Sequence, residues 1–228
     1  MFDGYYSSYI YVLIPLIISL WASSRVNSTF TRYSKVFSAR GLTAAQVTRM
    51  ILDNAGLRHV GIERVSGNLT DHFDPRSNVI RLSDTVYDST SVAAIGVAAH
   101  EAGHAQQYRD NYLPIKIRSA LVPVANLGSQ LAMPLLLIGL LMSFAGLVDI
   151  AIWLYVAVVA FSVITLPVEF NASSRAIRTL EGYGILSDEE NKAAKKVLSA
   201  AAMTYVAATL AAIGTLLRLL SLSGRRRD

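Results

Sequence analysis

Two long apolar segments in the middle of the chain restrict its fold more than any other feature. Residues 131–148 and 150–166 contain no charged side chain and are separated by Asp149 alone. Each approaches the ~20 residues that a helix needs to cross the hydrocarbon core of a bilayer. We therefore predict a helical hairpin in the membrane, with Asp149 as a turn residue and not as a metal ligand.

Two further segments are candidates for the membrane. The run Tyr9–Trp21 is apolar apart from Ser19 and has no Lys or Arg ahead of it, which favours an uncleaved anchor over a secretory signal cleaved after residues 22–24. Residues 197–222 form an Ala-rich apolar helix that either crosses the membrane or packs as a core helix. Since charged residues make up 16% of the chain, against about a quarter in soluble domains, we expect three to four membrane helices.

The basic residues indicate which side of the membrane the polar part occupies. None precedes the first apolar run, whereas Arg25, Arg32, Lys35 and Arg40 follow it. Because Lys and Arg near a span end favour the cytoplasmic side, we predict a multi-pass plasma-membrane protein with its active site in the cytoplasm. The basic residues do not form an aromatic-interleaved stripe, which argues against a nucleic-acid partner. The sequence does not indicate the oligomeric state.

Residues 25–118 are polar and predict a small folded domain. Thr43 and Gln46 form a capping-box pattern before a short helix. Alternating residues at 61–65, 68–73 and 78–83, with a turn at 74–77, predict a short antiparallel sheet. Residues 78–83 are a candidate edge strand for holding an extended substrate, or else an ordinary strand. A buried helix is expected at about 92–108, and a second capping box at Ser187–Glu190 opens a later helix.

The chemistry is indicated by the sequence His100-Glu101-Ala102-Gly103-His104. Four residues along a helix bring both imidazoles to one face, where they can bind one ion. Water on such an ion has its pKa lowered to about 7, and Glu101 can take its proton as general base. This is the H-E-x-x-H arrangement of zinc peptidases, against the alternative of two core histidines. Gly103 is unfavourable in a helix, and the close approach of another backbone would explain it.

A catalytic zinc usually has three protein ligands and an open position. The chain has no cysteine, so the third ligand must be a histidine or a carboxylate. Candidates are His59 and His72 upstream, and Glu169 and Glu181 downstream. Glu169 directly follows the second arm of the predicted hairpin. Because the hairpin crosses the membrane twice, it returns Glu169 to the side on which the motif lies.

Three segments, at 71–83, 98–107 and 169–176, resemble the bacterial YugP-type neutral zinc metallopeptidases, which are membrane-associated and gluzincin-like. The resemblance implies a Zn²⁺ cofactor with Glu169 as third ligand beside His100 and His104. Ser173 and Asn171 stand where acidic residues are expected, which leaves the groups supporting the ligands undefined.

The expected fold is a mainly α membrane protein with a small α+β zincin-like catalytic domain. Its predicted segments are an anchor (1–24), a catalytic segment (25–118), an interfacial helix and membrane hairpin (119–167), a helix with the third ligand (168–196), an apolar helix (197–222) and a basic tail (223–228).

The expected function is that of a membrane-anchored zinc endopeptidase. Its partners are a peptide or protein substrate, including membrane proteins, and the lipid bilayer. The alternatives are an intramembrane metalloprotease and a non-catalytic membrane scaffold. Candidates for stabilising the oxyanion are Tyr108, Arg175, Tyr183 and Tyr205.

Overall fold

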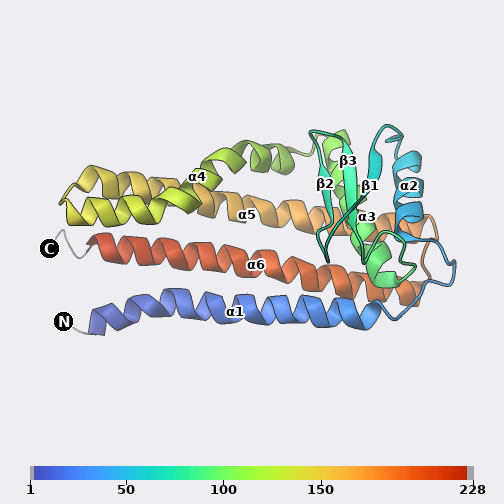
Figure 1. Ribbon diagram of the computed structural model, residues 1–228, viewed down its shortest axis with the longest axis horizontal. Coiled ribbons are helices and arrows are strands. Elements are labelled where there is room, and N and C mark those ends of the chain that lie inside the picture. Colours follow the sequence, from blue (N-terminus) through green and yellow to red (C-terminus); the bar gives the residue numbers. More distant parts are fainter. Residues whose placement is uncertain (1–2, 225–228) are drawn as a thin grey trace. The chain divides into compact units, whose positions relative to one another are not determined.

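The computed structural model describes residues 3–224 and is mainly helical (Figure 1). The end of the predicted basic tail, residues 225–228, lies outside the described residues. The helices are α1 (Asp3–Tyr33), α2 (Ala44–Asn54), α3 (Val92–Arg109), α4 (Leu113–Leu141), α5 (Ala145–Gly182) and α6 (Asp188–Gly224). The strands are β1 (Gly61–Val65), β2 (His72–Asp74) and β3 (Val79–Ser83).

The chain forms two compact units. The helical unit contains Met1–Ser23, Pro114–Pro167 and Met203–Asp228, and the mixed unit contains Ser24–Leu113 and Val168–Ala202. Four helices are long and apolar enough to cross a membrane, at Tyr9–Tyr33, Leu113–Leu141, Ala145–Gly182 and Asp188–Gly224. Their number agrees with the three to four membrane helices expected from the sequence.

Close helix packing holds the helical unit together. A Cβ atom added to Gly128 in α4 would lie 2.5 Å from the carbonyl oxygen of Leu154 in α5. A Cβ atom at Gly214 in α6 would likewise overlap the carbonyl oxygen of Tyr11 in α1. Small residues of this kind let apolar helices approach closely where no hydrophobic effect drives them together. The apolar half of α6 therefore packs against α1 and is also long enough to span.

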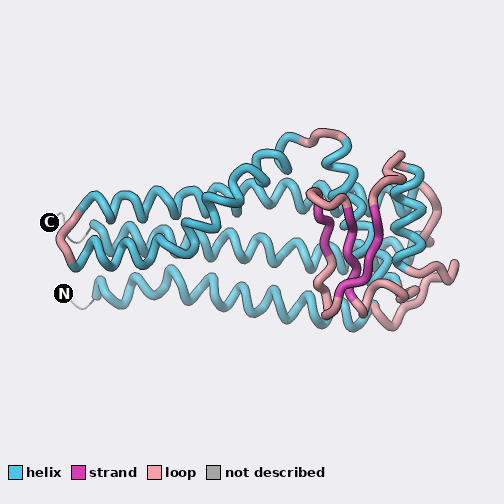
Figure 2. Tube along the Cα trace, turned by 45° about the horizontal axis from the view of Figure 1, so that its top comes forward, coloured by secondary structure: helices cyan, strands magenta, loops and turns pink. Residues whose placement is uncertain are grey.

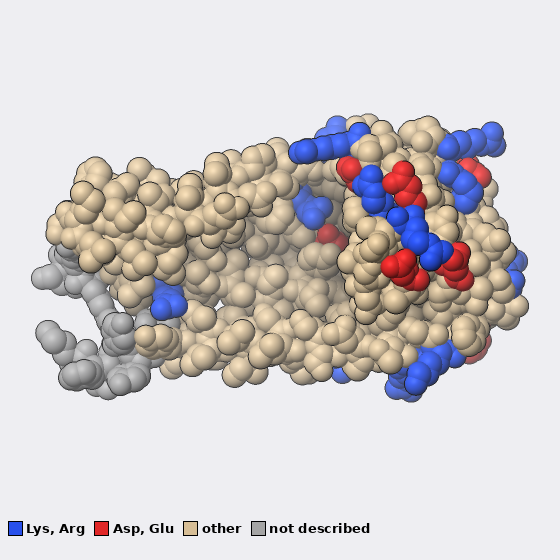
Figure 3. Space-filling model, viewed as in Figure 1, with Lys and Arg blue, Asp and Glu red and all other residues tan. Residues whose placement is uncertain are grey.

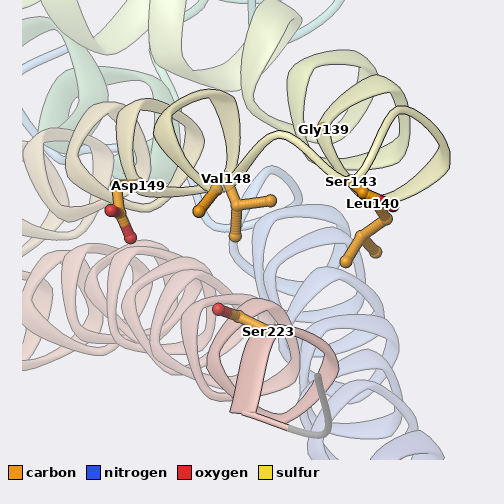
Figure 4. A pocket seen from close by; sticks show the side chains of 7 residues that line it. Gly139, Leu140, Ser143, Val148, Asp149 and Ser223 are labelled. Atoms are coloured by element: carbon orange, nitrogen blue, oxygen red, sulfur yellow. The ribbon is translucent and has the colours of Figure 1, made fainter. Parts of the chain in front are cut away.

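The hairpin turn lies earlier than predicted. It consists of residues 142–144, and Asp149 lies inside α5. Ser143 has a left-handed φ of 58°, and the Phe144 amide donates to the Gly139 carbonyl, which together end α4. Figure 4 shows Asp149 beside the turn, lining a pocket with Leu140, Ser143 and Ser223. The predicted helix with the third ligand is also not separate, because α5 continues through Pro167 to Gly182.

The mixed unit is built around an apolar core of its own. Val47, Ile51 and Leu52 of α2 pack there with buried residues of β3 and α3. Both predicted capping boxes are confirmed: Thr43 and Gln46 exchange bonds of 2.9 and 3.2 Å, and Ser187 and Glu190 exchange bonds of 2.7 and 3.3 Å. These caps fix where α2 and α6 begin.

The sheet of the mixed unit differs from the prediction in two ways (Figure 2). Its strand order is β1-β3-β2, with β1 parallel and β2 antiparallel to β3, so the sheet is mixed and not antiparallel. The predicted edge strand, residues 78–83, is the central one, and β2 lies at the edge. The reason is that the connection between β1 and β2, residues 66–71, leaves a position between these two strands, and β3 occupies it. The Asp71 carboxylate anchors this connection by accepting from the Ser83 amide at 2.8 Å and its hydroxyl at 2.9 Å.

The charged side chains of this sheet neutralise one another. Arg64 pairs with Asp84 and Asp88, and Arg81 pairs with Glu63 and Asp74. Figure 3 shows these acidic and basic groups interleaved on the surface of the mixed unit. Such a face is solvated and carries no strong net charge.

Candidate metal centre

Three side chains that are distant in sequence meet in the mixed unit. His100 and His104 of α3 and Glu169 of α5 have ligand atoms that all lie within 4.8 Å of one another. The Nε2 atoms of His100 and His104 lie 3.2 and 3.5 Å from Oε2 of Glu169. Glu169 is only 2% exposed, so its carboxylate faces the two imidazoles and not solvent.

This cluster fits a zinc ion by donor type and by spacing. Two imidazole nitrogens and one carboxylate oxygen are a set found in catalytic zinc sites. Ligand atoms at about 2.0–2.1 Å from a tetrahedral ion lie roughly 3.3 Å from one another. The observed separations of 3.2 and 3.5 Å are close to that value.

The other candidate third ligands lie elsewhere. His59, His72 and Glu181 are exposed, and none of them belongs to the cluster. The Nδ1 atom of His72 instead bonds the Thr70 carbonyl at 2.9 Å. Of the four candidates in the sequence, the structure brings only Glu169 to the histidines.

Gly103 explains how α3 and α5 come close enough to share the site. A Cβ atom at this position would lie 2.6 Å from the carbonyl oxygen of Ala172, three residues after Glu169. The close backbone approach predicted from the sequence is therefore confirmed. The Ser91 cap, whose hydroxyl accepts from the Ala94 amide at 3.2 Å, sets the start of α3.

We expect a Gly103→Ala variant to destabilise the protein and weaken metal binding. The added methyl group must push the α5 backbone away, at a cost of about 1–3 kcal/mol, which exceeds the ~1 kcal/mol gained in helix propensity. Thermal unfolding in detergent and zinc titration measure the two effects. Gly96→Ala in the same helix is the matched control, because its Cβ atom would lie an ordinary 3.4 Å from Cβ of Ala194. Equal stability and zinc affinity of the two variants would contradict the close approach.

Charge in the cluster favours a cation. Burial opposes a charge on His104, but the hydrogen bond to Glu169 and the negative charges of Glu101 and Glu169 outweigh it and raise the pKa of His104. The carboxylate of Glu169 in the cluster and that of Glu101 next to it thus make the site attractive to positive charge.

Glu101 lies on the same helix as the histidines and is held by the edge strand. It is 8% exposed, and its Oε2 atom accepts from the backbone amide of Phe73 in β2 at 2.9 Å. The ring of Phe73 packs edge-to-face on Tyr108, with centroids 5.7 Å apart. The strand that borders Glu101 is therefore β2, and the sequence did not identify Phe73 because it acts through its backbone.

Uncharged groups contact both histidines, and one of them is Ser173, at a position where the sequence led us to expect an acidic residue. The Nδ1 atom of His100 lies 3.1 Å from Oγ of Ser173, and that of His104 lies 3.0 Å from Oε1 of Gln107. These contacts leave both Nε2 atoms facing Glu169. Gln107 shares a helix face with His104, three positions before it, but this spacing alone does not reveal that its side chain contacts the imidazole.

Of the four candidates for stabilising an oxyanion, Arg175 is engaged by other side chains. Arg175 binds Asn171 and Asp110. Hydrogen bonds from Arg109 and then Arg175 lower the pKa of Asp110 to about 2. Tyr183 is 42% exposed. Tyr108 lies two turns after Glu101 on the same face of α3. It is therefore the candidate for stabilising an oxyanion that lies on the helix of the motif.

Comparisons with known proteins agree with this chemistry. Residues 8–224 match the family described as "Putative neutral zinc metallopeptidase". The chain is 45% identical over 216 residues to "Putative membrane protease YugP" of Bacillus subtilis (strain 168), covering 95% of this chain and 96% of that protein. No solved structure matches.

Proposed function

This chain belongs to the neutral zinc metallopeptidase family, whose cofactor is Zn²⁺, and on that premise we propose that it is a membrane-anchored endopeptidase. His100, His104 and Glu169 hold the zinc, and Glu101 is the general base. The observation that carries the proposal is the convergence of His100 and His104 of α3 with Glu169 of α5, while Glu101 directly follows His100 on α3. The substrates are peptide bonds of proteins or peptides at the cytoplasmic membrane surface.

The residues divide the reaction between them. Zinc in this site supplies Lewis acidity, which makes water nucleophilic at neutral pH. Glu101 takes the proton from the attacking water as oxygen adds to the peptide carbonyl carbon. It then gives that proton to the nitrogen as the C–N bond breaks. The Phe73 amide keeps one carboxylate oxygen of Glu101 fixed, which leaves the other for the proton.

The edge of β2 supports a peptide as substrate. One side of this strand pairs with β3, and the Phe73 amide on the other side points to Glu101. An extended peptide added to this edge would lie beside the general base, with main-chain hydrogen bonds supplying affinity.

The alternative of an intramembrane protease has less support. The motif helix α3 is not among the helices long and apolar enough to span. Its last turn holds Gln106, Gln107 and Arg109. We therefore favour a site in the polar mixed unit.

Metal-dependent hydrolysis tests the proposed function directly. We expect the full-length protein, purified in detergent, to contain one equivalent of zinc and to cleave members of a peptide library. A chelator should abolish cleavage, and added zinc should restore it, because the three ligands hold the only Lewis acid in the proposed mechanism. Mass spectrometry of the peptides and elemental analysis of the protein provide the measurements. Absence of bound zinc, or hydrolysis that survives chelation, would exclude this function.

Cysteine labelling tests the proposed cytoplasmic location. The chain contains no cysteine, so single cysteines at Asp84, Ser143 and Ser187, all exposed, report their own positions. We expect an impermeant reagent on intact cells to label Ser143→Cys in the hairpin turn and to miss the other two. The reason is the basic residues that follow the first span. Permeabilised cells, in which all three sites should react, are the control. Labelling at Asp84 but not at Ser187 would separate the proposed ligands by a bilayer and remove the site.

A further inference from the structure

Gln107 is an uncharged side chain at the centre of the mixed unit, with every polar atom in use. It is 0% exposed. Its Oε1 atom lies 3.0 Å from Nδ1 of His104, and its Nε2 atom donates to the Val168 carbonyl at 2.8 Å and to Oδ1 of Asn171 at 3.0 Å. A buried amide costs free energy unless it is bonded in this way. Gln107 thus connects a histidine of α3 to the turn of α5 that carries Glu169.

The donor and the acceptor of each of these hydrogen bonds can be assigned from neighbouring groups that can only donate or only accept. Arg175 can only donate, and its Nε atom lies 2.8 Å from Oδ1 of Asn171, which fixes that oxygen as an acceptor. The Val168 carbonyl also only accepts. The amide nitrogen of Gln107 must therefore face both of them, and its oxygen must face His104. Because that oxygen can only accept, the Nδ1 atom of His104 carries a hydrogen, so in the neutral imidazole that binds a metal the Nε2 atom presents the lone pair.

The same bonds form a closed ring between the two helices. Arg175 is paired with Asp110, the residue that caps the C-terminal end of α3. The ring thus runs from His104 through Gln107, Asn171 and Arg175 and returns to α3. It contains one ion pair, and the group that it places on Nδ1 of His104 is the amide oxygen of Gln107 and not a carboxylate. Metal-bound histidines are commonly backed by a carboxylate, a carbonyl or water, and such partners fix the ring and its tautomer.

We propose that Gln107 is the positioning residue of the zinc site. It fixes the tautomer and orientation of His104 and sets the spacing between His104 and Glu169, without adding negative charge. The inference rests on the proposed function, since it takes His104 and Glu169 as ligands. Gln107 does not touch the substrate, and its effect reaches the reaction only through His104.

Metal affinity and ligand geometry test this role without any assay of hydrolysis. We expect Gln107→Met, which keeps the length of the side chain and removes its bonds, to weaken zinc binding by about 10- to 100-fold. The absorption spectrum of the cobalt-substituted protein should also change, because His104 is free to turn. Gln106→Met is the matched control. Gln106 is also buried, at 8% exposure, and its replacement makes the same chemical change beside the ring of hydrogen bonds. It should keep the wild-type zinc dissociation constant and cobalt spectrum.

A second variant keeps the test decisive if Gln107→Met does not fold. Asn171→Leu leaves Gln107 and His104 in place but removes one acceptor that orients the amide, so a smaller loss of zinc affinity is expected. A role limited to packing would lower the unfolding temperature of the metal-free protein and leave zinc affinity and the cobalt spectrum unchanged, and that result overturns the inference. Failure of the wild-type protein to bind zinc would overturn the proposed function instead.

Discussion

Replacement of Glu101 by Gln is expected to leave zinc bound and to reduce peptide hydrolysis by roughly 10³-fold or more, since general base catalysis contributes about 10²–10⁴. The glutamine oxygen can still accept from the Phe73 amide, so the side chain keeps its position and loses only its ability to take a proton. Turnover of a cleaved peptide and elemental zinc analysis of the same preparation measure both effects.

A matched control shows that the loss is specific to this carboxylate. Glu189→Gln makes the same change at an exposed position in the first turn of α6 and should retain wild-type turnover. If the Glu101→Gln protein cleaves at a near wild-type rate, Glu101 is not the base and the mechanism is wrong.

Glu169→Ala should have the largest effect on the metal. It removes the only carboxylate of the cluster and leaves two imidazoles, which do not complete the set of a catalytic zinc site. The dissociation constant for zinc should rise by more than the roughly 10–100-fold that follows loss of a supporting residue. Competition with a chromophoric chelator gives this constant, and hydrolysis should be lost with the metal.

The control for this variant lies on the same helix. Glu181 is exposed near the end of α5 and is not part of the cluster of His100, His104 and Glu169, so Glu181→Ala should keep both zinc and activity. Full zinc occupancy in the Glu169→Ala protein would show that another residue completes the site.

The parts of the molecule that follow from local patterns could be predicted from the sequence. The spacing of His100 and His104 places both on one face of a helix, and the structure adds Glu169 to them. The capping boxes at Thr43 and Ser187 are formed by residues three positions apart, so the sequence contains all the information they need. Gly103 was informative because a glycine inside a helix is costly unless something else requires it.

The features that the sequence did not reveal depend on distant contacts. Residues 78–83 alternate like any half-buried strand, and nothing within them shows that β1 and β2 pair on either side. The hairpin turn at Ser143 is set by a left-handed residue inside an apolar run, whereas the charge of Asp149 was the more visible signal. The contribution of Gln107 appears only when α5 supplies Val168 and Asn171, which lie 61 and 64 residues away.

The separation of the proposed ligands along the chain has a consequence for biosynthesis. Glu169 lies 69 residues after His100, beyond the whole of α4 and more than half of α5. At roughly 5–20 residues per second, a ribosome needs about 3–14 s to add that stretch. During this interval the nascent chain carries the two proposed histidine ligands, His100 and His104, and lacks Glu169. The order of translation therefore leaves the proposed zinc site incomplete until both arms of the hairpin have been synthesised.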